Sequence, residues 1–160
     1  MKNYIMNSIK KYILVVILVA LTSGFGLQAQ NGLKIKKIFD DYASGKDVVM
    51  VQLTNETMDG FYFSLYKSIL IKGNPELIDI VQKCVDQDEN RSAKVKKMES
   101  GRGGERKSTT FLQLPKQNNL FRLILYKNEV NKQSEQTSLL IYIETTSNPD
   151  DMLNFILKKK

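Results

Sequence analysis

The 160-residue chain contains no histidine, no tryptophan and a single cysteine. The absence of histidine excludes serine–histidine and cysteine–histidine nucleophile pairs, HExxH-type zinc sites and the commonest general base near neutral pH. The lone Cys84 excludes a disulfide within the chain, and its apolar helical surroundings predict that it packs as a small hydrophobe. Only carboxylate, tyrosine, lysine and serine groups remain for catalysis, so we expect a protein that is not an enzyme.

A hydrophobic run long enough to span a membrane is also missing. The apolar run Tyr12–Leu21 has about half the length that a spanning helix needs. It follows three lysines and precedes small residues ending at Ala29, which is the order of a secretory signal peptide. We predict cleavage after Ala29, with residues 30–160 forming one exported domain and no transmembrane segment after cleavage. An uncleaved N-terminal anchor is the alternative.

The spacing of apolar residues predicts three helices and six strands. Steps of three and four residues mark the helices, two of which begin at the typical starts Asn74-Pro75 and Asn148-Pro149. Short runs rich in β-branched and aromatic residues mark the strands. The segment 61–72 also has a helical stripe, but its length and aromatic content favour a strand. The expected helices are 32–43, 75–85 and one from Pro149; the expected strands are 48–53, 61–72, 94–99, 107–114, 120–126 and 138–144.

The order of these elements, α-β-β-α-β-β-β-β-α, predicts an α+β fold with an antiparallel sheet of five to six strands and helices covering one face. A glycine-rich turn at 101–104 joins the third and fourth strands. A long loop, 127–137, joins the last two strands, and a helical turn precedes Phe61.

Two segments come close to known ligand motifs and fail at required positions. Residues 101–108 approach a phosphate-binding loop, but Arg106 replaces its second glycine and strand residues follow it. Asp86, Asp88 and Asn90 have the first spacings of a calcium loop, but Arg91 stands where that loop needs glycine. We therefore predict no metal and no cofactor.

The segment 91–107 is the best candidate for a binding surface. It holds seven basic residues against two glutamates, whereas residues 30–160 together carry a net charge of only +4. Such a cluster attracts an acidic protein, an acidic glycan or an anionic lipid surface. It lacks the interleaved aromatics of single-stranded nucleic-acid binders, and a solvated hairpin whose lysines protect a sheet edge is the alternative. The predicted contact residues are Arg91, Lys94, Lys96, Lys97, Arg102, Arg106 and Lys107.

Several runs together resemble a family of small exported proteins of unknown function typical of Bacteroidetes. The resemblance implies a periplasmic or secreted setting in a Gram-negative bacterium, and it implies no activity and no site residues. The runs that carry it are 27–33 (Leu-Gln-Ala-Gln-Asn-Gly-Leu), 48–54 (Val-Val-Met-Val-Gln-Leu-Thr), 65–68, 71–72, 74–76 and 139–144 (Leu-Leu-Ile-Tyr-Ile-Glu).

These observations favour an exported, non-catalytic binding or interaction domain whose basic hairpin at 91–107 contacts an acidic partner. Two alternatives stay open. One is a histidine-free enzyme that uses carboxylate, tyrosine or lysine groups, and the other is a structural component of a cell-envelope assembly. The sequence does not indicate an oligomeric state.

Overall fold

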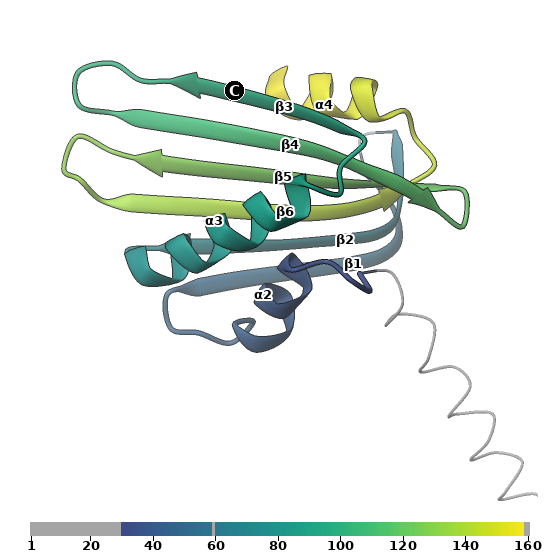
Figure 1. Cartoon of the computed structure of the whole chain (residues 1–160), viewed down its shortest axis with the longest axis horizontal. Coiled ribbons are helices and arrows are strands. Elements are labelled where there is room, and N and C mark those ends of the chain that lie inside the picture. Colours follow the sequence, from purple (N-terminus) through teal and green to yellow (C-terminus); the bar gives the residue numbers. More distant parts are fainter. Residues whose placement is uncertain (1–29, 59, 159–160) are drawn as a thin grey trace, which may run out of the picture. The chain divides into compact units, whose positions relative to one another are not determined.

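The computed structural model describes residues 30–58 and 60–158, so the predicted signal peptide lies outside the described residues. The chain falls into two units, 1–32 and 33–160, and the fold is that of the second unit (Figure 1). Its elements are α2 (Ile35–Asp41), β1 (Val48–Met58), β2 (Phe61–Lys72), α3 (Pro75–Glu89), β3 (Lys94–Ser100), β4 (Arg106–Gln117), β5 (Leu120–Val130), β6 (Gln136–Thr145) and α4 (Pro149–Lys158).

The strands form one antiparallel sheet in the order β1-β2-β6-β5-β4-β3. The predicted α+β class and the predicted element order are therefore confirmed, and 61–72 is a strand. The strands β3, β4, β5 and β6 follow one another as a meander, and β1 and β2 form a hairpin. Strand β6 joins these two blocks by pairing with β2.

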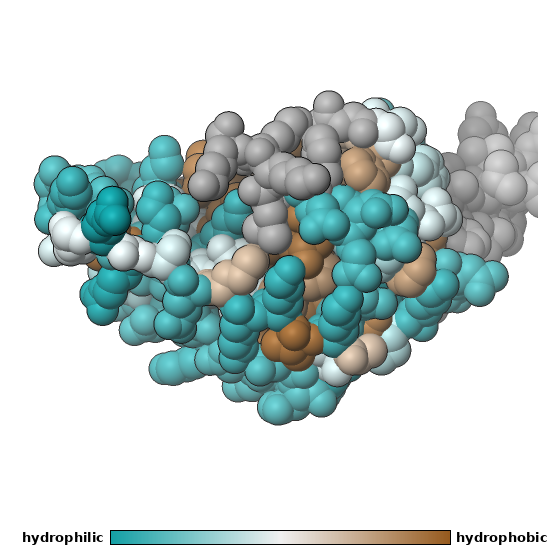
Figure 2. All heavy atoms as spheres, turned by 90° about the horizontal axis from the view of Figure 1, so that it is seen from above, coloured by the Kyte–Doolittle hydropathy of each residue, from teal (hydrophilic) through white to brown (hydrophobic). Residues whose placement is uncertain are grey.

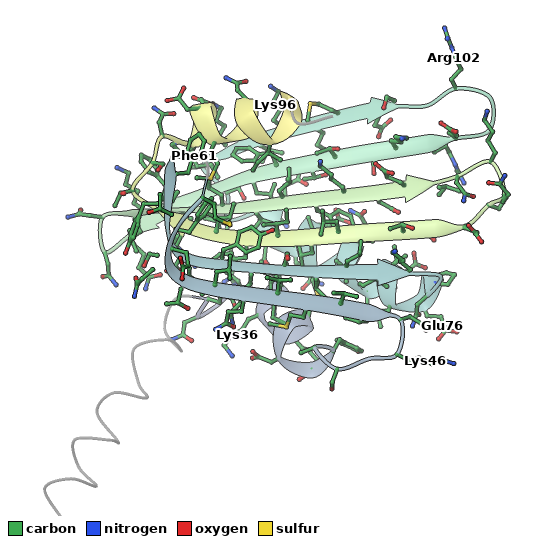
Figure 3. All side chains as sticks on the ribbon, turned by 180° about the vertical axis from the view of Figure 1, so that it is seen from behind. Lys36, Lys46, Phe61, Glu76, Lys96 and Arg102 are labelled. Atoms are coloured by element: carbon green, nitrogen blue, oxygen red, sulfur yellow. The ribbon has the colours of Figure 1, made fainter. Side chains whose placement is uncertain are left out.

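Helices cover both faces of the sheet, and the expectation that they cover one face is wrong. Residues directly opposite in an antiparallel sheet share a face. On one face, here called the α3 face, Lys97 pairs with Glu89 of α3 and Lys67 lies against Phe39 of α2. On the other, the α4 face, the buried residues of β4, β5 and β6 form a cluster with Met152 and Leu153 of α4. Figures 1 and 3 show these two faces from opposite sides.

Consecutive buried residues explain why α4 lies opposite the other helices. Leu123, Ile124 and Leu125 alternate between the faces of β5, and all three are buried. A strand that is apolar on both faces needs a covering layer on each side. The amphipathic helix at the C-terminal end of the described chain provides the second layer.

Several predicted strands are too short, because the paired strands of the structure continue beyond the apolar runs into polar sequence. The loop predicted at 127–137 shrinks to 131–135, where the Asn131 side chain accepts hydrogen bonds from the backbone N–H groups of Gln133 and Glu135, each 2.9 Å. Strand β1 continues to Met58, where a helical turn was expected before Phe61. The backbone N–H and C=O groups of these polar residues form cross-strand hydrogen bonds, which do not depend on the type of side chain.

Helix α3 also runs past its predicted end because its polar last turn has a structural partner. Asp88 is fully buried, and its two carboxylate oxygens accept from the backbone N–H groups of Lys34 (2.8 Å) and Ile35 (3.0 Å) at the start of α2. The carboxylate thus caps a neighbouring helix. This role accounts for Asp88, whereas Asp86 accepts a hydrogen bond from the Gln82 side-chain amide at 2.8 Å.

Candidate functional site

An open hollow of about 790 Å³ lies at the end of the β3–β4 hairpin. In Figure 1 this is the corner where the tips of the β3–β4 and β5–β6 hairpins lie side by side, beyond the start of α3. We call it the hairpin-end hollow. Its lining is formed by residues 99–108 of the hairpin together with Asn128, Val130 and Gln136.

The register of the strands explains how these side chains come together. Glu99, Ser108 and Asn128 are opposite one another on β3, β4 and β5. Arg106, Val130 and Gln136 form the next row, on β4, β5 and β6. Both rows lie on the α3 face, which α3 does not cover at this corner (Figure 1). The hollow therefore has a floor built from four adjacent strands.

The floor is polar and partly fixed. The Gln136 side-chain amide donates to the Asn128 side-chain oxygen at 3.1 Å, and both residues are half-buried, as is Ser108. Each amide keeps further hydrogen-bonding capacity beyond this one bond. Such a floor offers donors and acceptors to a hydroxylated or carboxylated ligand.

Three of the seven predicted basic residues line the hollow. Arg102 projects from the hairpin tip (Figure 3), and Arg106 and Lys107 begin β4. Lys107 lies 3.9 Å from Glu129, and strand alternation puts this pair on the α4 face, opposite the floor. Arg102 and Arg106 form no ion pair within the described residues. Viewed from above, the surface at this end is predominantly hydrophilic (Figure 2). Two carboxylates, Glu99 and Glu105, also belong to the lining.

The structure does not bring the other four predicted residues to this hollow. Lys94 pairs with Asp150 of α4 at 2.6 Å, and Lys97 pairs with Glu89 of α3 at 2.7 Å, a contact that raises the pKa of Lys97. Lys96 projects from the face opposite Lys97, because neighbouring strand residues alternate. Arg91 lies in the turn after α3. The seven residues thus occupy both faces and both ends of β3.

The tip of the hairpin requires glycine at Gly101 and at two of its neighbours. A Cβ atom at Gly101 would lie 2.2 Å from the backbone oxygen of Glu105, and Gly103 and Gly104 have φ angles of +60° and +90°. Other residues rarely adopt these φ values. The glycine-rich run therefore shapes the turn from which Arg102 projects outward, away from the sheet (Figure 3).

A second polar cluster, on the α3 face, was missed by the sequence analysis. The Tyr142 hydroxyl donates to Glu144 at 2.6 Å and accepts from Arg122 Nε at 3.1 Å, and Lys67 is opposite Tyr142 on β2. Burial, with the charge of Glu144, raises the pKa of Tyr142 well above its usual value, and burial lowers the pKa of Lys67. The only sequence signal was the alternation that puts Tyr142 and Glu144 on one face.

Comparison with known protein families identifies the family of this chain. Residues 22–156 match a family described as a family of unknown function, DUF6108. The chain belongs to the DUF6108 family. No curated protein and no solved structure shows significant similarity to it. Membership covers nearly the whole described domain, including the hairpin-end hollow.

The described part of this DUF6108 protein contains neither a metal-ligand cluster nor a membrane-spanning helix. Within residues 30–58 and 60–158, no three acidic, cysteine or histidine side chains cluster so that they could hold a metal ion. No helix in these ranges has the length and apolar character needed to cross a membrane. Cys84 is half-buried on α3, and burial raises the pKa of its thiol, which disfavours the reactive thiolate.

Proposed function

We propose that this DUF6108 protein is an exported, non-catalytic domain, periplasmic or secreted, that binds an acidic partner through the hairpin-end hollow. The observation that carries the proposal is that Arg106 shares the face of a floor formed by two side-chain amides, while Arg102 and Lys107 also belong to the lining of the hollow. Guanidinium groups bind carboxylates in a planar, two-bond geometry. The signal-peptide pattern of residues 1–29 supports export.

The shape of the hollow favours an acidic glycan over the other two partner classes. A lipid surface is best bound by a flat array of cations, whereas the hollow here is concave and has a hydrogen-bonding floor beside Arg106. The amides of Asn128 and Gln136 and the Ser108 hydroxyl offer partners for sugar hydroxyls, and the two arginines offer partners for carboxylates. An acidic protein would present carboxylates without that hydroxyl pattern.

Binding to three probes tests this function: polygalacturonate, polyglutamate and vesicles with an anionic headgroup. We expect the triple variant Arg102→Gln, Arg106→Gln, Lys107→Gln to weaken polygalacturonate binding about tenfold or more at low salt, since exposed charge contacts contribute up to about 1 kcal/mol each. The change is measured by isothermal titration calorimetry across salt concentrations.

A matched control removes the same charge elsewhere. Lys37, Lys83 and Lys116 are exposed and lie outside the hollow, so their replacement by Gln is expected to change affinity less than about twofold. Equal losses in the two triple variants would contradict a specific site. N-terminal sequencing of the chain recovered from the periplasmic fraction checks export, with Gln30 expected as the first residue.

The polar cluster around Tyr142 favours one alternative, a histidine-free enzyme. Lys67, Arg122, Tyr142 and Glu144 come from three strands, and a lysine with a lowered pKa can act as a base. The raised pKa of Tyr142 keeps its hydroxyl protonated, so this hydroxyl is not available to accept a proton as a base. Under this alternative, Lys67→Met would abolish an activity found by substrate screening while leaving polygalacturonate binding unchanged.

A further inference from the structure

The two edges of the sheet differ in charge. The edge strand β3 is short and contains three lysines, which discourage another strand from pairing with it. The opposite edge strand, β1, has 11 residues and contains neither lysine nor arginine, with Glu56 as its single charge. The β1 edge thus lacks the protection that the β3 edge has.

The backbone of β1 is available along this edge beyond Val48, whose N–H donates to the Gly45 oxygen at 3.2 Å. The Lys72 N–H donates to the Asp47 oxygen at 3.0 Å, and these residues stand opposite in the register of β1 and β2. Because inward and outward groups alternate in an antiparallel pair, Val48, Met50, Gln52 and Thr54 direct their N–H and C=O groups away from β2. Within the described residues, no other strand pairs with β1.

An apolar row accompanies this open backbone on the α4 face. Val49 and Val51 are 60% and 43% exposed, which is unusual for adjacent same-face valines in a strand. Val49 is opposite Leu70, which is opposite the half-buried Leu139. The row runs from the interior of the sheet to its edge, where Val49 and Val51 are exposed.

We propose that β1 is a dimerisation edge, and that it pairs antiparallel with β1 of a second copy of this chain to form a continuous twelve-stranded sheet. In such a dimer, residues whose backbone N–H and C=O groups point away from β2 must pair with residues of the same kind in the second copy. The two-fold axis therefore passes through a position where one residue is opposite the same residue of the second copy. Centring the axis on Val51 puts Val49 opposite Leu53 of the second copy and Met50 opposite Gln52. This register brings the exposed valines together.

Charge complementarity supports a second copy as the occupant. In the register centred on Val51, Lys46 of one copy comes level with Glu56 of the other, at both ends of the paired strands. No two like charges are opposite each other, and like charges opposite one another are unfavourable in strand pairs. The strand is therefore complementary to itself in charge as well as in apolar side chains.

Sedimentation of the full chain over about 1 to 200 µM, the range of weak-to-moderate dimers, tests the proposal. We expect a concentration-dependent dimer whose dissociation constant rises about tenfold or more in Val51→Lys, since a charge replaces an apolar contact at the axis. Val95→Lys is the matched control: Val95 is 41% exposed on β3, and its change is expected to leave dissociation within about twofold. A chain that stays monomeric, or a dimer insensitive to Val51→Lys, overturns the proposal.

Disulfide trapping tests the register independently of stability. In a Cys84→Ser background, Val51→Cys is expected to cross-link to its own counterpart, because Val51 directs its backbone inward and so forms a non-hydrogen-bonded pair across the axis, where side chains approach closely. Val95→Cys serves as the control. Cross-linking no faster in Val51→Cys than in Val95→Cys, or capture of a different chain's strand in place of a second copy, overturns the proposal.

Discussion

At the scale of single residues, buried polar groups determine how the helices and strands are held together. Asp88 uses both carboxylate oxygens on the first turn of α2, and Tyr142 links Arg122 to Glu144 on the α3 face. When a buried polar group loses its hydrogen-bond partner, its desolvation penalty is no longer offset and the folded state is destabilised. Each of these groups therefore makes a measurable difference to stability.

Replacing Asp88 with alanine is expected to lower the free energy of unfolding by about 1–3 kcal/mol, the usual effect of losing hydrogen bonds to a buried charged acceptor. Urea unfolding followed by circular dichroism measures the change. Asp79→Ala, an exposed position on the same helix, serves as the control and is expected to shift stability by less than about 0.5 kcal/mol. Equal stabilities of Asp88→Ala and the wild type would contradict the capping role.

Tyr142 is expected to make the fold sensitive to alkali. Its pKa is raised in the folded state, chiefly by burial, so the folded chain holds this proton more tightly than the unfolded chain. The contribution is complete below the unfolded pKa of about 10 and is lost as pH rises above it. Urea midpoints between neutral and alkaline pH should therefore fall more steeply for the wild type than for Tyr142→Phe.

The exposed Tyr62, whose hydroxyl donates to Asn55, provides the comparison for this pH profile. Tyr62→Phe is expected to reproduce the wild-type slope because its hydroxyl is near solvent. Parallel slopes in the wild type and Tyr142→Phe would show that Tyr142 is not the group responsible.

At the scale of elements, tight turns set the register of the meander. The β4–β5 turn uses Asn118 and Asn119, with φ angles of +51° and +62° between the paired Gln117 and Leu120. Two consecutive positive φ angles are typical of the two-residue hairpin turn that matches the twist of the strands. Asparagine tolerates this conformation better than most residues.

Changing Asn119 to alanine is expected to destabilise the fold by about 1 kcal/mol, because alanine pays a steric cost in the left-handed region. Asn119→Gly is expected to be neutral or slightly stabilising for the same reason. Thermal unfolding of the three proteins measures the difference. A variant with alanine as stable as the one with glycine would mean that the turn adopts another conformation in solution.

Local patterns were sufficient to predict the order and type of the elements. The cap is an example: Asn74 accepts from the Leu77 N–H at 3.0 Å, as the Asn-Pro pattern indicates. Features that depend on distant residues were not predictable. The contact of Asp88 with α2, the pairing of Lys94 with Asp150 and the hydrogen bond between Asn128 and Gln136 all require the sheet order. The charge of 91–107 was visible in the sequence, but its division between two faces was not.

At the scale of the whole domain, helices pack on both faces of one sheet, with α2 and α3 on one face and α4 on the other. The layer between the sheet and α4 contains Phe111, Leu125, Ile141 and Leu153, all nearly inaccessible to solvent. A single C-terminal helix thus covers a large apolar surface. Its apolar contacts matter more than the helix propensity of its sequence.

Leu153→Ala is expected to cost about 2–4 kcal/mol, the usual range for truncating a buried leucine. The neighbouring exposed Asn154→Ala is the control and should change stability by less than about 0.5 kcal/mol. Urea unfolding of both variants measures this. If Leu153→Ala were no worse than the control, α4 would not be a stable part of the domain.

The position of β6 also has a consequence for how the chain is made. Strand β6 lies between β2 and β5 in the sheet, yet it is the last strand in chain order. During synthesis, β1 and β2 emerge early and cannot join the meander until residues 136–145 have left the ribosome. The two blocks of the sheet therefore join only late in synthesis, when most of the chain has already been made.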